Sequence, residues 1–209
     1  MRVGILGGAF NPPHIGHVVC AQEALVQLEL DRVVFMPVGV APHREIEHDP
    51  GAEARLEMAE LAVAGDDRFE VSRMEVDKDA PAYTSETLAA LRDETPDDEL
   101  FLILGGDQAA SLGRWHEPEQ VLERATVAVF ERGSWGRNAI IITIGRLPGA
   151  ERVRYLDMPL IQVSSSQVRR RVREGRPIRY LVPDKVASYI EENGLYRTGK
   201  GSTKEAVAT

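Results

Sequence analysis

Several features that are common in other protein classes are scarce or missing in this chain of 209 residues. It has one cysteine, Cys20, so it forms no internal disulfide and no cysteine-based metal cluster. No apolar run approaches the length of about 18 residues that a membrane-spanning helix needs. Positive charge is also in short supply: the formal net charge is −8, which argues against a general nucleic-acid binder. We therefore expect a cytoplasmic protein that binds neither membranes nor nucleic acid.

The composition otherwise suits one compact domain. Hydrophobic residues make up 43% of the chain and charged residues 28%, which at this length supplies one sizeable core. The apolar start MRVGILGGAF runs into Asn11-Pro12-Pro13 and not into a small-residue cleavage site, so it indicates a buried strand and not a signal peptide. We expect a single domain over residues 1–197 and a disordered tail over residues 198–209, which are small and polar. The sequence leaves open whether the domain forms a homo-oligomer.

Apolar, strand-like runs alternate along the chain with segments of helical periodicity. Strands are predicted over Val3–Leu6, Arg32–Val38, Phe69–Val76, Leu100–Leu104, Thr126–Phe130, Val153–Leu156 and Leu160–Val163. Helices are predicted from His14 to about Leu28 and over Ala54–Ala64, Ser85–Arg92, Glu117–Arg124, Gln167–Arg173 and Asp184–Asn193. Residues 139–144 stay undecided between strand and helix. The alternation predicts the α/β class, with a Rossmann-like, doubly wound parallel sheet that carries helices on both faces.

Ligands of such sheets bind beyond the carboxyl ends of the strands. This rule predicts that four segments share one rim of the sheet: Gly7–His17, Gly39–Arg44, Gly105–Asp107 and Ser164–Ser166.

The first of these segments, in the stretch GGAFNPPHIGHVV, combines a stiff turn with two histidines. Glycine lets the backbone come close to a ligand, and proline stiffens the turn. A helix that begins near His14 points free N–H groups and the positive end of its dipole at the rim. His14 and His17 are three residues apart, so they share one face and can both face a bound phosphate. A zinc site is the competing interpretation, but the chain offers no HExxH pattern and no cysteine pair.

GGAFNPPHIGH resembles the signature of the nucleotidyltransferase superfamily that shares the HxGH motif. That superfamily includes adenylyltransferases, cytidylyltransferases and the class I aminoacyl-tRNA synthetases. A synthetase is disfavoured because this chain has no KMSKS-like lysine loop, is too short for a tRNA-binding domain and is acidic. Two residues depart from the commoner GGTFDPxH pattern, since Ala9 and Asn11 stand where Thr and Asp are usual.

VSSSQVRRRVREG, which starts at Val163, is similar to the superfamily's ISSTxIR segment, with Ser166 in place of Thr. Serines at a helix start supply hydroxyl groups and an N-cap, and the helix N-terminus favours anions. Arg169 stands at the arginine position of the motif, where its planar fork suits a triphosphate.

Three further segments narrow the resemblance to the bacterial nicotinate-nucleotide adenylyltransferase family. They are VAPHRE, which contains Arg44, APAYTSETL, which contains Tyr83, Thr84 and Thr87, and GGDQAASLGRWHE, which contains Gly105, Asp107 and Trp115. The resemblance implies transfer of the adenylyl group of ATP to nicotinate mononucleotide, which forms nicotinate adenine dinucleotide and pyrophosphate in NAD biosynthesis. It also implies Mg²⁺ bound with ATP, and we expect no metal ligand from the protein itself.

The resemblance implies a role for each matching residue. The implied catalytic residues are His14, His17, Arg44 and Arg169. The implied ATP-binding residues are Gly7, Gly8, Ala9, Phe10, His14, His17, Gly105, Asp107, Ser164, Ser165, Ser166 and Arg169. The implied mononucleotide-binding residues are Asn11, Arg44, Tyr83, Thr84, Thr87 and Trp115, with Trp115 stacking on the pyridine ring.

Two other functions stay open. One is an adenylyltransferase of the same superfamily that acts on nicotinamide mononucleotide or phosphopantetheine. A phosphopantetheine enzyme would be shorter and would lack the YTxxT and GGDxxxxLxxW pair found here. The other is a non-catalytic nucleotide-binding module, whose mark would be damaged motif histidines, whereas His14 and His17 are both present.

Overall fold

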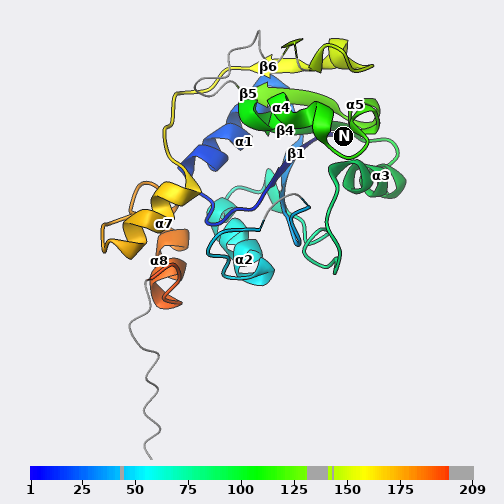
Figure 1. Ribbon diagram of the computed structural model, residues 1–209. Coiled ribbons are helices and arrows are strands. Elements are labelled where there is room, and N and C mark those ends of the chain that lie inside the picture. The colour runs from blue at the N-terminus through cyan, green and yellow to red at the C-terminus, as the bar shows by residue number, and fades with distance from the viewer. Residues whose placement is uncertain (43–44, 131–140, 143, 198–209) are drawn as a thin grey trace, which may run out of the picture.

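One sheet of six parallel strands organises the protein (Figure 1). The computed structural model describes residues 1–42, 45–130, 141–142 and 144–197. The strands lie in the order β3-β2-β1-β4-β5-β6. Their bounds are Arg2–Gly8 (β1), Arg32–Pro37 (β2), Phe69–Val71 (β3), Glu99–Gly105 (β4), Thr126–Phe130 (β5) and Arg154–Leu156 (β6). Because the chain moves outward from β1 in both directions, the sheet is doubly wound, which confirms the predicted Rossmann-like fold.

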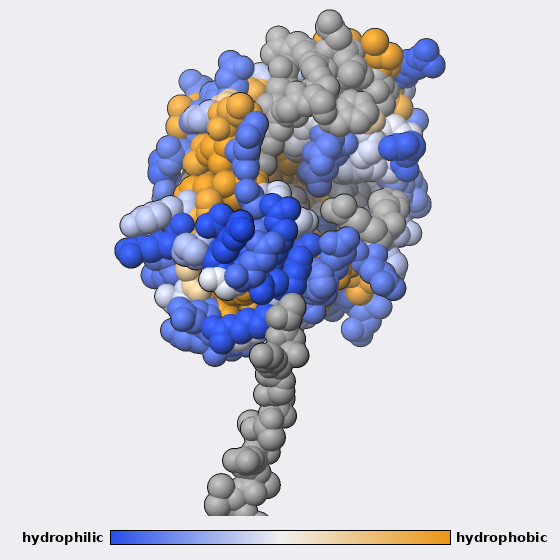
Figure 2. All heavy atoms as spheres, turned by 60° about the vertical axis from the view of Figure 1, so that its left-hand side comes forward, coloured by the Kyte–Doolittle hydropathy of each residue, from blue (hydrophilic) through white to orange (hydrophobic). Residues whose placement is uncertain are grey.

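Helices cover both faces of the sheet. Their bounds are Ile15–Gln27 (α1), Ala52–Val63 (α2), Thr84–Glu94 (α3), Gly106–Ser111 (α4), Pro118–Arg124 (α5), Ser165–Arg173 (α7) and Asp184–Glu192 (α8). Helices α1 and α2 pack on one face, and α3, α4 and α5 pack on the other. Helices α7 and α8 lie beside α2, against which they bury a third apolar cluster. The outer face of α7 and α8 is largely hydrophilic (Figure 2).

The apolar strands read as continuous hydrophobic runs because each side of the sheet has its own core. In β4, Leu102 and Leu104 pack with α3, α4 and α5, while Phe101 and Ile103 face α1 and α2. The same alternation holds in β1, where Ile5 and Leu6 point to opposite faces. Two-sided burial leaves only the strand ends for ligand binding.

Two predicted strands are wrong in whole or in part. The strand predicted over Phe69–Val76 ends at Val71, and a turn follows over residues 74–77. Residues 160–163 form no strand, because they connect the edge strand β6 to α7 and Leu160 is 74% exposed. The short helix α4 was not predicted, because six residues that begin with glycine carry little periodicity. Of the undecided segment 139–144, the described residues 141, 142 and 144 are helical.

Candidate active site

The turn between β1 and α1 brings the first motif to the carboxyl end of the sheet. Gly8 ends β1, Phe10 adopts a positive φ of 46°, and a cis peptide bond joins Asn11 to Pro12. His14 then caps α1 with an extended backbone. This path confirms the predicted course from an apolar strand through a stiff turn into a helix, with the start of α1 one residue later than expected.

The two histidines of the motif lie face to face. Their rings stack with centroids 3.8 Å apart and an angle of 24° between the planes. The backbone N–H of His14 donates to Nδ1 of His17 at 3.1 Å. Because Nδ1 accepts this bond, the proton of a neutral His17 ring sits on Nε2, which makes Nε2 a hydrogen-bond donor. The edge of His17 also packs against Phe10, at a centroid distance of 5.2 Å. His17 is therefore held in an orientation that presents a donor, as phosphate binding requires.

Asn11 is buried and connects three distant segments. Its Nδ2 donates to the carbonyl of Glu47 at 2.8 Å, and its Oδ1 accepts from the hydroxyl of Tyr196 at 2.7 Å. Burial raises the pKa of the Tyr196 hydroxyl, which keeps it a neutral donor. An aspartate would accept from Tyr196 but could not donate to Glu47, so the amide suits both contacts. In this structure Asn11 stabilises the loop, whereas the resemblance implies that it binds the mononucleotide.

Helix α7 closes on the same turn. Ser164 caps the helix by accepting the N–H of Gln167, and the hydroxyl of Ser165 donates to the carbonyl of Pro12 at 2.8 Å. Arg169, which is 6% exposed, donates from Nη1 to the carbonyl of Asn11 at 2.8 Å. Residues more than 150 positions apart in the chain thus form one cradle, as the rim rule predicted.

Arg169 keeps further hydrogen-bonding capacity in this cradle. Its Nη2 contacts Glu47 Oε2 at 3.1 Å and Ser166 Oγ at 3.3 Å. Its Nε is buried and has no hydrogen-bond partner among the described residues. Glu47 is itself 76% exposed, so this ion pair is well solvated and weak. A triphosphate can replace Glu47 as the acceptor of this guanidinium.

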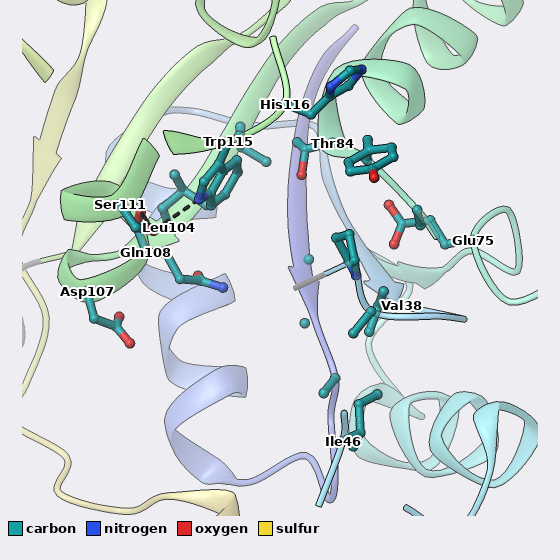
Figure 3. A pocket seen from close by; sticks show the side chains of 18 residues that line it. Val38, Ile46, Glu75, Thr84, Leu104, Asp107, Gln108, Ser111, Trp115 and His116 are labelled. Atoms are coloured by element: carbon teal, nitrogen blue, oxygen red, sulfur yellow. Dashed lines mark hydrogen bonds between the residues drawn. The ribbon is translucent and has the colours of Figure 1, made fainter. Parts of the chain in front are cut away.

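A pocket of about 360 Å³ opens at the carboxyl end of the sheet (Figure 3), and the described residues that line it do not include His14, His17 or Arg169. Its wall includes the β1 end, the loop after β2, the loop before α3, and the segment from α4 to Trp115. Seven of the predicted site residues line it: Gly7, Gly8, Ala9, Tyr83, Thr84, Asp107 and Trp115. The indole Nε1 of Trp115 donates to Ser111 Oγ at 3.0 Å, which fixes the ring at one side of the pocket. Trp115 is therefore placed to stack on a flat ligand, although it also packs against the core.

His116 and Glu75 also line this pocket, and neither was predicted from the sequence. The ring of His116 contacts Tyr83 at a centroid distance of 4.5 Å. Glu75 is only 8% exposed, and its Oε1 accepts the hydroxyl hydrogen of Thr87 at 2.7 Å. Thr87 is thus buried behind the pocket wall and supports Glu75, and it does not line the pocket as a predicted mononucleotide ligand would. Burial raises the pKa of Glu75, although the bond from Thr87 opposes this shift.

This raised pKa gives a stability prediction. The folded protein resists ionisation of Glu75, so folding carries a penalty that is fully present above the folded-state pKa. The penalty vanishes below the unfolded pKa of about 4.3, where the carboxyl is protonated in both states. We expect Glu75→Gln to raise the free energy of unfolding at pH 8, with the gain shrinking toward pH 4. Urea unfolding at a series of pH values measures it, and a constant difference across that range would contradict the assignment.

Arg55 is a third residue near the site that the sequence did not reveal. Its side chain is fully buried and donates to the carbonyls of Ala9 at 3.2 Å, Val38 at 2.5 Å and Gly39 at 3.0 Å. Its charge is balanced by Asp49, whose Oδ1 lies 2.9 Å from Nε. Arg55 therefore ties the ends of β1 and β2 together beneath the pocket. Its position on α2, surrounded by ordinary helix-forming residues, gave no signal of this role.

Two further predicted site residues, Gly105 and Phe10, do not line the pocket. Gly105 lies at the end of β4, where it leads into α4, and Phe10 is buried beside His17. Arg44 and the tail 198–209 lie outside the described residues. Among the described residues, no group of three or more His, Cys, Asp or Glu side chains is arranged to hold a metal ion. The helices of the described part of the chain include none that is both long and apolar enough to cross a membrane.

Comparisons with known proteins establish the family. Residues 5–171 match the model of the family described as cytidylyltransferase-like. A relative from Rubrobacter xylanophilus, named "probable nicotinate-nucleotide adenylyltransferase", is 37% identical over 205 residues, which cover 98% of this chain and 96% of the relative. A relative of the same name from Roseiflexus sp. is 43% identical over 197 residues, which cover 93% of this chain and 98% of the relative. The chain belongs to the nicotinate-nucleotide adenylyltransferase family.

Solved structures agree with this membership at the level of the fold. The Plasmodium falciparum nicotinic acid mononucleotide adenylyltransferase complexed with NaAD superposes with a TM-score of 0.74 at 16% identity, covering 93% of this chain and 97% of that one. The same enzyme complexed with APC gives a TM-score of 0.74 at 15% identity, covering 93% and 96%. The family match over residues 5–171 runs from β1 through most of α7, so it spans both His17 and Arg169.

Proposed function

We propose that this protein transfers the adenylyl group of ATP to nicotinate mononucleotide, forming nicotinate adenine dinucleotide and pyrophosphate in NAD biosynthesis. One observation carries the proposal: a cradle built by His14, His17 and Arg169 lies at the same rim as a pocket walled by Trp115. The cradle suits the phosphates, and the pocket suits the flat ring of the mononucleotide. Close relatives of nearly the same length carry the name of this activity.

Adenylyl transfer requires that the two substrates are positioned and that negative charge is stabilised, and it does not require a general base. The phosphate of the mononucleotide attacks the α-phosphorus of ATP, and its second pKa of about 6 leaves it ionised at pH 7. The obstacle is repulsion between anions, together with the charge that develops on the transferring group. Nε2 of His17 donates to a phosphate oxygen, and the positive end of the α1 dipole adds to the attraction. We assign Arg169 and Arg44 to the remaining phosphate oxygens.

We also propose that Mg²⁺ accompanies ATP and that the reaction takes place in the cytoplasm. The ion neutralises charge on the phosphates when bound, and it needs few protein ligands because it keeps much of its water shell. Asp107, exposed at the pocket wall, is the carboxylate available to contact its waters or a ribose hydroxyl. A cytoplasmic location is supported by the cysteine content, since a chain with one cysteine forms no internal disulfide.

Pyrophosphate release from ATP with a panel of acceptors tests the proposed function. Nicotinate mononucleotide, nicotinamide mononucleotide and phosphopantetheine are offered separately at matched concentrations. We expect release with the nicotinate acceptor at the highest kcat/KM. Release with phosphopantetheine alone would indicate a different adenylyltransferase of this fold, and ATP binding without any release would indicate a non-catalytic module.

Trp115 and the ring substituent make separate contributions to this selectivity. A carboxylate pairs both oxygens with donors such as the Thr84 hydroxyl, whereas an amide leaves one donor unpaired, so we expect at least ~10-fold preference for the acid. Stacking hardly depends on that substituent. Trp115→Ala should therefore raise KM for both mononucleotides by about 10-fold and leave KM for ATP nearly unchanged. Steady-state kinetics with each mononucleotide measures both effects.

Two outcomes would count against these assignments. Equal efficiency of the wild type on acid and amide would refute the specificity while leaving the adenylyl transfer intact. If Trp115→Ala unfolded, or if it changed KM for ATP as much as KM for the mononucleotides, Trp115 would be a core-packing residue and not a stacking partner of the pyridine ring.

A further inference from the structure

The reaction as described leaves one charged residue of the pocket without a role. Glu75 lines the pocket, is 8% exposed, and follows β3 in a turn that the sequence did not reveal. A buried carboxylate disfavours folding, and it stands in a pocket whose proposed ligand is an acid. Burial of the Glu75 carboxylate costs folding free energy, and its charge repels an acidic ligand. A carboxylate that is present despite both effects indicates a functional role.

The position of Glu75 is fixed from both sides. Its Oε1 accepts the Thr87 hydroxyl at 2.7 Å, from the buried face of α3. Its backbone packs on the loop after β2 so closely that a Cβ placed on Gly39 would lie 2.2 Å from the Glu75 carbonyl oxygen. The carboxylate is therefore held at the wall and does not swing freely into solvent. Figure 3 shows Glu75 and Trp115 on opposite sides of the pocket.

The proposed acceptor has a positive charge where such a carboxylate is useful. The ring nitrogen of nicotinate mononucleotide is bonded to ribose, which makes the ring a pyridinium cation although the molecule as a whole is anionic. The carboxylate of Glu75 attracts this cation from one side of the pocket, and the face of the Trp115 indole attracts it from the other side. The mononucleotide also carries negative charge on its ring carboxylate and on its phosphate. We assign the carboxylate to the donors near Thr84 and the phosphate to the cradle.

We propose that Glu75 is a specificity-determining residue whose carboxylate selects the cationic pyridinium ring against neutral rings of the same shape. The inference rests on the proposed function, since it takes a pyridine mononucleotide as the ligand. It is independent of the choice between acid and amide, because both of these mononucleotides carry the same ring cation. Glu75 touches no reacting atom and so acts on binding.

A ligand pair that differs in ring charge tests the proposal. Two-electron reduction of nicotinate mononucleotide gives the 1,4-dihydro form, which has the same substituents and a neutral ring nitrogen. The two forms are titrated calorimetrically at pH 8 into the wild type, Glu75→Gln and Thr87→Val, with an ATP analogue that has a methylene bridge between the α and β phosphorus atoms. Glu75→Gln removes the charge and keeps an acceptor for Thr87, whereas Thr87→Val removes that hydrogen bond and keeps the charge.

We expect the wild type to bind the cationic form at least ~10-fold more tightly than the neutral form. Glu75→Gln should reduce this ratio by about 10-fold through weaker binding of the cation, and Thr87→Val should leave the ratio within about 2-fold of the wild type. KM for ATP should be unchanged in Glu75→Gln. Thermal unfolding of each variant confirms that the fold is kept.

Three results would overturn the proposal. A wild-type ratio near one would do so without any variant. Equal weakening of both forms by Glu75→Gln would mean that Glu75 accepts a ribose hydroxyl or only supports the wall. Loss of the ratio in Thr87→Val, together with an unchanged ratio in Glu75→Gln, would mean that the hydrogen bond matters and the charge does not. Failure of the proposed function is recognised separately, because it removes pyrophosphate release whatever the binding ratio is.

Discussion

His17→Ala should lower kcat by ~10²-fold or more, which is the effect of losing one donor to charge that develops in the transition state. The imidazole is held by its stacking on His14 and by the bond that Nδ1 accepts from the His14 backbone. This arrangement leaves Nε2 as the donor of the neutral ring, and we assign this donor to a phosphate of ATP. Because the contribution belongs to the transition state, saturating both substrates should not restore the rate.

The control for His17→Ala is a histidine outside the site. His48 is exposed and does not line the pocket, so His48→Ala should keep kcat within about 2-fold of the wild type. The substitution at position 17 also removes the acceptor for the His14 N–H, which costs about 1 kcal/mol of stability. Assays are therefore run well below the unfolding temperature. Near-normal kcat in His17→Ala at saturating substrate would reject the assignment.

Arg169→Ala should weaken ATP binding by ~10-fold or more and lower the free energy of unfolding by about 2 kcal/mol. The guanidinium is buried, and its removal leaves the carbonyl of Asn11 without its donor. It also removes the positive charge that we assign to the triphosphate. Arg169→Lys would keep the charge and lose the planar fork, so we expect it to recover only part of the affinity.

Arg171 is the matched control on the same helix. Its Nε donates to the carbonyl of Pro177 at 2.9 Å in an exposed setting. Arg171→Ala should change the free energy of unfolding by no more than about 0.5 kcal/mol and leave ATP binding unaltered. ATP titrations of the two variants give the comparison. Equal losses would mean that the arginines of α7 act together as a diffuse basic patch.

The parts of the site that sequence predicts well are local. The run VGILGG, the prolines and the two histidines occupy one continuous stretch, so the strand, the stiff turn and the helix start could all be predicted. The doubly wound order followed from alternating periodicity, because buried parallel strands and covering helices leave distinct patterns. Ser164 and Arg169 were singled out because VSSSQVRRRVREG resembles a superfamily motif that occupies one continuous stretch.

The parts that were missed depend on contacts between distant segments. Arg55 reaches the carbonyl of Ala9, 46 positions away, and Tyr196 reaches Asn11, 185 positions away. Glu75 was assigned to a strand because its neighbours are apolar or β-branched, yet pairing with β2 ends at Val71 and the chain turns into the pocket. For Leu160, an apolar run indicated a strand, but no described strand lies beyond β6 to pair with it. Periodicity reports on local geometry and gives no information on which partners are available.

The fate of the α-phosphorus of ATP tests the central claim most directly. ATP labelled at that phosphorus is incubated with the enzyme, Mg²⁺ and nicotinate mononucleotide, and the products are separated by chromatography. We expect the label to appear in nicotinate adenine dinucleotide, in a one-to-one ratio with unlabelled pyrophosphate. Label that stays in ATP, or that appears in AMP without any dinucleotide, would contradict it.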